Sequence, residues 1–179
     1  MSPSRSRWDS VANPKSTKNY AVLSADVIAI GDLVWFDKRT QTVKAFSHLD
    51  AWTGSTAGSQ GKVAENFVGV ASSAHVANDA TVTTVRVEAK GMVDYPLDIS
   101  AIVEIGDLVT AAKDPAGNFL YAQRVAKGAL GDPDEPTSLA REIAIGKVAI
   151  RSTVAVADCA FEILGMREAG GGPRMYLTS

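Results

Sequence analysis

Few residues of this chain have the types and spacing that catalysis or ligand binding requires. The stretch 58–62 contains the Gly-Lys pair that ends a phosphate-binding loop, in which backbone N–H groups and a lysine hold phosphates. That motif also needs a glycine five residues before the glycine of the pair, and Ser or Thr after the lysine. Thr56 and Val63 occupy those two positions, so we expect a surface loop that binds no nucleotide.

The other reactive side chains are isolated along the chain. The single cysteine, Cys159, lies in an alternating apolar run and is predicted to be a small core residue rather than a nucleophile. One cysteine forms no intramolecular disulfide and excludes a Cys-rich zinc site. We interpret His48 and Asp50 as loop residues rather than as a pair of metal ligands.

Catalytic motifs are missing from the sequence as well. It contains no Gly-x-Ser-x-Gly nucleophile elbow, and its carboxylates are scattered. We therefore expect no catalytic residue, no metal site and no cofactor, and we predict that the protein is not an enzyme. A pair of facing carboxylates in a pocket, as in glycosidases, is the enzymatic alternative.

Length, composition and charge narrow the function classes further. The chain has 179 residues, of which 46% are hydrophobic and 21% charged, enough apolar residues to bury a core in one domain or two small ones. A net charge of −2 gives no basic field that would attract nucleic acid or an anionic membrane. No apolar run is long enough to span a bilayer, and the first residues lack the apolar block of a secretory signal. We expect a soluble protein made in a cytoplasm.

Both ends of the chain differ in composition from its middle. Residues 1–19 combine prolines and serines with four basic residues and one acid, and they are predicted to form a flexible N-terminal arm. Residues 169–179 begin with a Gly-rich hinge and end in an apolar tail. Between these two segments we expect one β domain over residues 20–168.

Strand signals dominate that middle part. Residues 84–89 alternate between polar and apolar, as in a half-buried strand. Turn residues at 37–40 and 114–117 each separate two short β-type runs, which predicts two hairpins. The runs expected to be strands are 27–30, 33–36, 42–45, 108–111 and 119–122. A helix of one or two turns is predicted only at 136–142, so the fold class is mainly β, a compact β-barrel or sandwich with at most one short helix.

An internal repeat is the most informative feature of the sequence. Ile-Gly-Asp-Leu-Val at 30–34 recurs at 105–109, an offset of 75 residues. Two further matches follow in the same order. The segment 67–71 is echoed by 145–149, with Gly69 and Gly146 77 residues apart, and 83–87 is echoed by 160–164, also at an offset of 77. We therefore predict two similar halves, about 27–97 and 98–168, each interrupted by a long irregular loop at a corresponding place, 48–62 and 126–135.

The order of these segments resembles the small capsid decoration, or cement, proteins of tailed bacteriophages over residues 27–165. The resemblance implies a β-rich module, with no catalytic residues, that binds the major capsid protein on the outside of the capsid. It also implies a homotrimer that stabilises the expanded shell after DNA packaging, made in the host cytoplasm and located on the virion exterior. The long loops and the arm depart from the family, whose members are often shorter.

Within this interpretation, the two ends of the chain supply the contacts with neighbours. Basic residues of the arm would pair with an acidic capsid surface, and the arm would add a strand to an exposed sheet edge. Aromatic and apolar residues would anchor both ends. The predicted contact residues are Arg5, Arg7, Trp8, Lys15, Lys18, Tyr20, Met175, Tyr176 and Leu177.

Two other function classes remain open at this stage. A phage tail or surface β-module that binds host glycans would need an exposed aromatic platform, for which Trp35 and Trp52 are the candidates. Against this, we interpret Trp35 and Phe36 as strand residues, at least one of them in the core. A cellular interaction protein is the other class.

Overall fold

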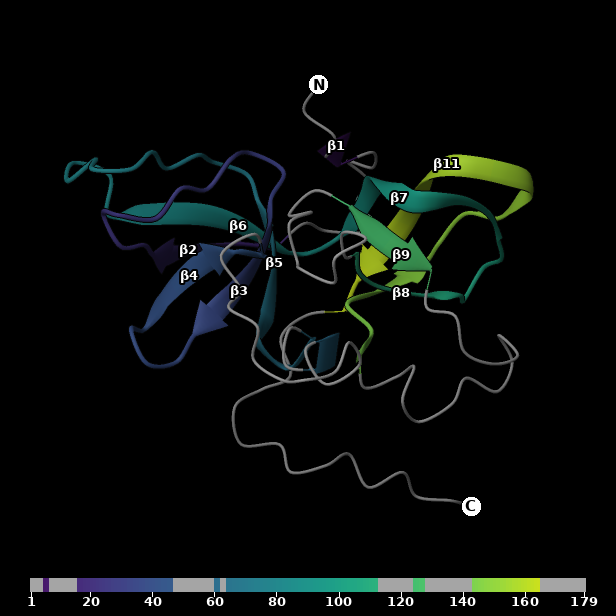
Figure 1. Cartoon of the computed structure of the whole chain (residues 1–179), viewed down its shortest axis with the longest axis horizontal. Helices are drawn as coiled ribbons and strands as arrows, with labels where there is room; N and C mark the ends of the chain where they lie inside the picture. Colours follow the sequence, from purple (N-terminus) through teal and green to yellow (C-terminus); the bar gives the residue numbers. More distant parts are fainter. Residues whose placement is uncertain are drawn as a thin grey trace, which may run out of the picture.

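The computed structural model describes residues 5–6, 16–46, 60–61, 64–112, 124–127 and 143–164 (Figure 1). These residues are mainly β, as predicted, with helical backbone only at 46, 60–61, 64–66 and 143. The strands are β1 (Arg5–Ser6), β2 (Ser16–Ala21), β3 (Leu33–Asp37), β4 (Thr42–Ala45), β5 (Phe67–Ala71), β6 (Thr84–Lys90), β7 (Met92–Val103), β8 (Leu108–Ala111), β9 (Val125–Lys127), β10 (Gly146–Val148) and β11 (Ser152–Ile163).

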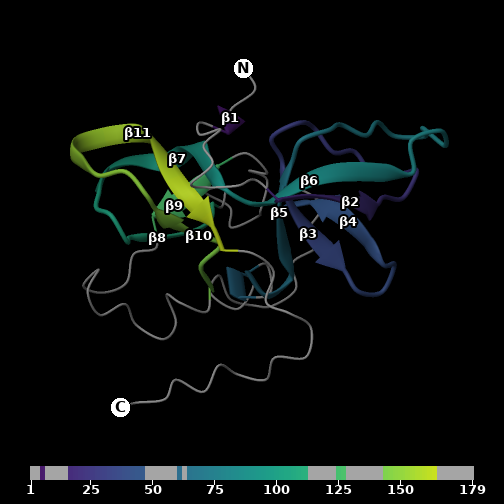
Figure 2. The ribbon, with the colours of Figure 1, turned by 180° about the vertical axis from the view of Figure 1, so that it is seen from behind.

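The strands form two sheets that lie side by side in both views of the ribbon (Figures 1 and 2). One sheet has the order β2-β6-β5-β3-β4, and we call residues 16–90 lobe 1. The other has the order β1-β7-β11-β10-β8-β9, and we call residues 92–164 lobe 2. In lobe 2 a parallel pairing of β7 with β9 joins the two ends of the row, so that five strands close into a barrel.

The two lobes have the same strand topology. When β2 to β6 are matched in chain order with β7 to β11, the two sheets have identical neighbour sequences, with β1 as an addition to lobe 2. The prediction of two similar halves is thereby confirmed. The change from one sheet to the other falls at Gly91, between β6 and β7, whereas the repeat predicted it near residues 97 and 98.

Most short strands lie where the residue pattern placed them. The hairpin of β3 and β4 has the predicted turn, with Val34 opposite Ala45 and Asp37 opposite Thr42. The alternation of β6 is also confirmed, because Val85 and Val87 are fully buried between exposed neighbours. The apolar side chains of both lobes form one continuous core, in which Phe46 packs on Phe67 and Tyr95 packs on Phe161.

Two local predictions need correction, and three others lie outside the described residues. The run 27–30 is not a strand, because only Ile28 pairs, in a single bridge with His75. The predicted arm overlaps β2, so that residues 16–19 belong to the sheet of lobe 1. The predicted turn at 114–117, the strand at 119–122 and the helix at 136–142 are outside the described residues, and β8 pairs instead with β9.

The hairpin of lobe 1 holds a buried acid in an ion pair. The Asp37 carboxylate accepts a hydrogen bond from the Arg39 backbone N–H at 2.9 Å and lies 3.2 Å from the Lys44 ammonium. Burial acts to raise the pKa of Asp37, but the Arg39 N–H and the Lys44 charge stabilise the carboxylate more strongly, and its pKa lies below the ordinary value of 3.8. The folded state therefore favours the charged form.

We expect Asp37→Asn to lower the free energy of unfolding at neutral pH and to flatten its acid dependence. Because the pKa is lower in the folded state, the Asp37 charge stabilises the fold fully above pH 3.8, and this contribution is lost as the pH falls through the folded-state pKa. Urea unfolding at pH 7 and at about pH 3 measures both effects. Glu65→Gln is the control, because Glu65 is 59% exposed and its pair with Lys38 is a surface one. A parallel acid dependence in wild type and Asp37→Asn would contradict this prediction.

Candidate interaction surfaces

The repeated Ile-Gly-Asp segment forms the same turn in both lobes. Gly31 and Gly106 have φ angles of 93° and 100°, a backbone conformation that favours glycine. The carboxylates of Asp32 and Asp107 each accept a hydrogen bond at 2.8 Å from the backbone N–H three residues earlier. These acids therefore stabilise the turns, as their position before a strand indicated.

The turn is also fixed to the same neighbouring strand in each lobe. The Gly31 N–H donates to the Ala71 carbonyl at 2.8 Å, and the Gly106 N–H donates to the Val148 carbonyl at 2.9 Å. Ala71 and Val148 in turn donate to the carbonyls of the two turn acids, at 2.8 and 2.7 Å. The duplication therefore extends to individual backbone hydrogen bonds, and both turns are rigidly held.

The two turns differ in what covers them. In lobe 1 the turn lies against lobe 2, where Tyr95 of β7 donates its hydroxyl hydrogen bond to the Gly31 carbonyl. Leu33, which follows this turn, is completely buried. In lobe 2 the equivalent Leu108 is only half-buried, and Ile105 is 68% exposed. Ile30 before the lobe 1 turn is itself 50% exposed, so the difference lies in the glycine and the leucine, which are buried in lobe 1 and half-buried in lobe 2. The lobe 2 turn is therefore the more open of the two.

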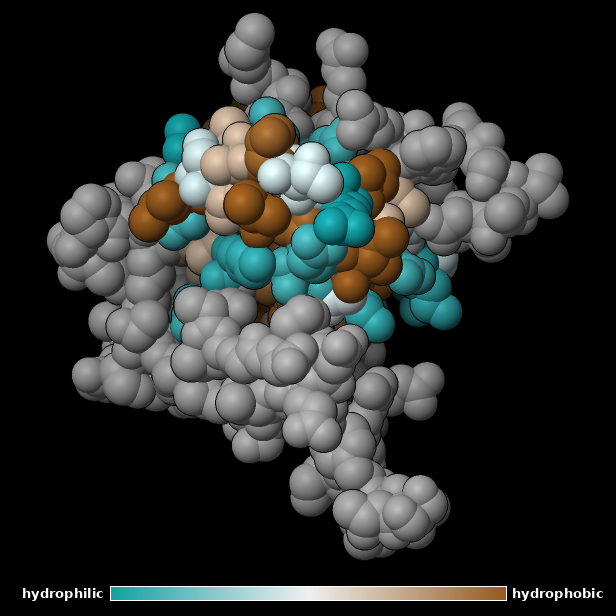
Figure 3. All heavy atoms as spheres, turned by 90° about the vertical axis from the view of Figure 1, so that its right-hand side faces the viewer, coloured by the Kyte–Doolittle hydropathy of each residue, from teal (hydrophilic) through white to brown (hydrophobic). Residues whose placement is uncertain are grey.

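Large aliphatic side chains gather around this open turn. Figure 3 views the molecule from the lobe 2 end, where hydrophobic residues lie in patches separated by hydrophilic ones. Strand pairing accounts for part of this arrangement, because Ser152 lies opposite Val103 and Val156 lies opposite Ala101 in the neighbouring strands β11 and β7. We call this set the lobe 2 end surface: Ile99 (75% exposed), Ile102, Ile105, Ile150 and Val154 (66% exposed).

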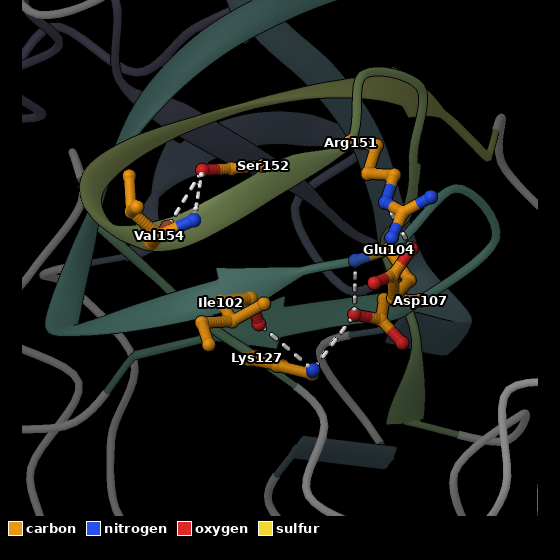
Figure 4. A network of polar contacts seen from close by, with 7 residues as sticks. All are labelled: Ile102, Glu104, Asp107, Lys127, Arg151, Ser152 and Val154. Atoms are coloured by element: carbon orange, nitrogen blue, oxygen red, sulfur yellow. Dashed lines mark hydrogen bonds and ion pairs between the residues drawn. The ribbon is translucent and has the colours of Figure 1, made fainter.

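Charged residues border the lobe 2 end surface (Figure 4). The Asp107 carboxylate forms an ion pair with the Lys127 ammonium at 2.8 Å, and Lys127 also donates a hydrogen bond to the Ile102 carbonyl at 3.0 Å. Glu104, which follows β7, pairs at 3.0 Å with Arg151, which precedes the neighbouring strand β11. Asp107 is buried, whereas Glu104 and Arg151 form a surface pair that contributes little stability on its own. Together the two pairs place both signs of charge beside exposed apolar groups. This combination is typical of protein interaction surfaces.

The structure describes only part of the set of contact residues predicted from the sequence. Lys18 is exposed on β2, and Tyr20 on the same strand is half-buried, packs near Phe36 and has a pKa raised by burial. Arg5 lies in β1, whose backbone pairs with β7. The other predicted residues lie outside the described part: Arg7, Trp8, Lys15, Met175, Tyr176 and Leu177.

Sequence reasoning missed the lobe 2 end surface, because it did not single out these apolar residues as exposed. The signal that could have revealed it is the isoleucine directly before each turn glycine, at 30 and 105. An apolar residue at a turn before a Gly-Asp pair is not required by the turn itself. Its presence at both copies of the repeat indicates a second role.

The remaining candidate groups of the described residues are structural. Cys159 is buried, and burial together with the nearby charges of Asp94 and Asp158 raises its pKa to about 12, so it is a core residue as predicted. Trp35 is buried and donates to the Ala45 carbonyl at 3.3 Å, so it offers no exposed face to a glycan. His48, Asp50 and Trp52 lie outside the described residues.

Across the described ranges, no group of three or more His, Cys, Asp or Glu side chains is arranged to hold a metal ion. No helix in that part of the chain is long and apolar enough to cross a membrane. Comparison of the chain with family models, with curated proteins and with solved structures found no match.

Proposed function

We propose that this protein is a structural component of a phage virion. It binds the major capsid protein on the outside of the capsid as a homotrimer and stabilises the expanded shell. The observation that carries the proposal is the lobe 2 end surface, in which exposed aliphatic side chains of β7, of β11 and of a hydrogen-bonded turn lie at one end of a closed barrel. The sequence resemblance to capsid decoration proteins supports the same assignment.

The physical requirements of a decoration protein agree with these features. Such a protein must bury apolar surface against its neighbours, and it gains most when that surface is rigid before binding, because little conformational entropy is then lost. The turns at Gly31 and Gly106 are held by backbone hydrogen bonds, and the barrel of lobe 2 is closed by β7 and β9. A trimer repeats each contact three times, so that modest individual affinities add up to stable coating.

The ends of the chain have a part in this proposal. The β1 segment pairs with the edge of β7, with Arg5 opposite Asp94 and Ser6 opposite Val93. Arg5 and Ser6 therefore have the extended backbone that edge pairing requires. The basic and aromatic residues beside β1 extend the contact to an acidic surface of the capsid protein, and the C-terminal Met175–Leu177 tail binds a neighbouring subunit.

Fractionation of a phage lysate on a density gradient, with quantitative mass spectrometry, tests this function. We expect the protein to migrate with DNA-filled particles in an amount comparable to the major capsid protein. The variant Ile102→Lys is expected to lose particle association, because it places a charge in the lobe 2 end surface. It should remain folded, because Ile102 is already half-exposed. The control variant Lys38→Ala lies on an exposed turn of lobe 1 and should bind normally. Recovery in the soluble fraction, or at a few copies per particle, would contradict the proposal.

A further inference from the structure

The contact between the two lobes uses positions that occur twice in the chain. Tyr95 of lobe 2 donates its hydroxyl hydrogen bond to the Gly31 carbonyl of lobe 1. At the repeat offset of 75 residues, Tyr95 corresponds to Tyr20 and Gly31 corresponds to Gly106. Each chain therefore contains a second tyrosine and a second turn of the same kind.

The correspondence is continuous along the chain. Residues 16–36 match 91–111 at the offset of 75 without insertion or deletion, and both tyrosines lie on the strand that precedes the turn. Both strands, β2 and β7, pair with the last strand of their own lobe. The two turns also share their backbone hydrogen bonds, as described above. The second pair therefore occupies the corresponding positions of the repeat, although β2 ends at Ala21 whereas β7 continues to Val103.

Burial shows that the second pair lacks the cover that the first pair has. Tyr95 is completely buried, whereas Tyr20 is half-buried, and Lys18 is exposed where the equivalent Val93 is buried. Gly31 is likewise buried, whereas Gly106 is half-exposed. In lobe 1 the surface around Tyr20 is thus uncovered, and in lobe 2 the turn at Gly106 is uncovered.

We propose that copies of this chain associate head to tail by repeating the internal lobe contact between molecules. The Ile105-Gly106 turn of one copy covers the Tyr20 side of the next copy, and Tyr20 donates its hydroxyl hydrogen bond to the Gly106 carbonyl. Lobe 1 of a second copy therefore covers the lobe 2 turn. The contact that it makes is the same kind as the contact already present between the two lobes of one chain.

The symmetry of the assembly follows from this contact. The two surfaces are different, so the interface is heterologous, and it must either close into a ring or continue as a filament. With the homotrimer of the proposed function, three copies close the ring and present six similar lobes around it. Only this ring size rests on the proposed function, because the contact itself is a property of the purified chain.

Sedimentation of the purified full chain over a concentration series tests the contact. We expect Tyr20→Phe to weaken self-association about tenfold, because it removes one hydrogen bond. Ile105→Arg places a charge beside the covered turn, where the equivalent Ile30 is 50% exposed, and should also weaken association. Val76→Arg is the matched control, because Val76 is 61% exposed. Its equivalent in lobe 2 is the start of β11, which lies on the side of lobe 2 away from lobe 1 (Figure 1). Val76 should therefore lie outside a contact that repeats the internal one. This control should associate as the wild type does.

A thiol cross-linking experiment identifies the surfaces directly. We expect the double variant Asn19→Cys/Ile105→Cys to be joined between copies by a short bismaleimide, whereas each single variant stays uncross-linked. The native Cys159 is buried and does not compete. A monomeric wild type, cross-linking of Ile105→Cys alone, or association unaffected by both Tyr20→Phe and Ile105→Arg would overturn the proposal. An associating chain that fails to migrate with capsids would instead contradict the proposed function.

Discussion

Gly69→Ala is expected to destabilise the fold by about 4 kcal/mol, because it combines overpacking with backbone strain. Gly69 lies in the fully buried strand β5, where a Cβ atom would stand 2.0 Å from the backbone carbonyl oxygen of Glu88 in β6. Its φ of +140° is also a conformation that residues with a side chain rarely adopt. A backbone atom cannot rotate away, so β5 and β6 would have to separate.

Substitutions of three other glycines distinguish overpacking from backbone strain. Gly146→Ala adds a Cβ 2.1 Å from the Phe161 ring, a packing conflict with a side chain, and should cost about 2 kcal/mol. Gly106→Ala meets only the end of Lys147 but has a φ of +100°, and should cost about 1 kcal/mol. Gly61→Ala meets no atom within 4 Å and serves as the control. Guanidinium unfolding gives all four values, and a Gly69→Ala protein as stable as Gly61→Ala would show that β5 and β6 are further apart in solution.

Truncation of Tyr95 is expected to have the second largest effect. Tyr95→Ala removes a completely buried aromatic side chain that packs on Phe161 and should cost about 3–5 kcal/mol. Tyr95→Phe keeps the ring but leaves the buried Gly31 carbonyl without this donor, and should cost about 1–3 kcal/mol. Since this bond joins the lobes, Tyr95→Phe should also broaden the unfolding transition as the lobes unfold less cooperatively.

Ser152→Ala is a suitable control for the loss of a hydroxyl. Ser152 donates to the Val154 carbonyl at 2.6 Å in an exposed part of β11, where water can replace the bond, so the change should stay within about 0.5 kcal/mol. Thermal unfolding followed by calorimetry compares the two variants. If Tyr95→Phe were as stable and as cooperative as Ser152→Ala, the lobes would be joined by apolar packing alone.

The sequence predicted the strands whose side chains alternate or whose turns have strong signals. The hairpin of β3 and β4, the alternation of β6 and the repeated Gly-Asp turns depend on local residue types, and local rules were sufficient for them. The strand β7 was not predicted because its sequence contains Pro96. Proline is usually found in edge strands or outside strands. Here Pro96 lies opposite Asp158 in a strand that continues on both sides.

The candidate surface was beyond local reasoning for a different reason. The two turns have nearly the same residues but different neighbours, and the neighbours decide burial: Gly31 and Leu33 are buried, whereas Gly106 and Leu108 are only half-buried. The equivalence of Tyr20 and Tyr95 became meaningful only when the hydrogen bond to Gly31 was seen. The contact residues predicted at the two ends of the chain stay predictions, because most of them lie outside the described part.

The arrangement of the two sheets in consecutive stretches of chain has a consequence for synthesis. All strands of lobe 1 lie between Ser16 and Lys90, before the first residue of β7. Because N-terminal domains fold first on the ribosome, lobe 1 can complete its sheet while lobe 2 is still being translated. Tyr95, made a few residues later, then meets a turn that is already formed, and the first lobe acts as the surface on which the second one assembles.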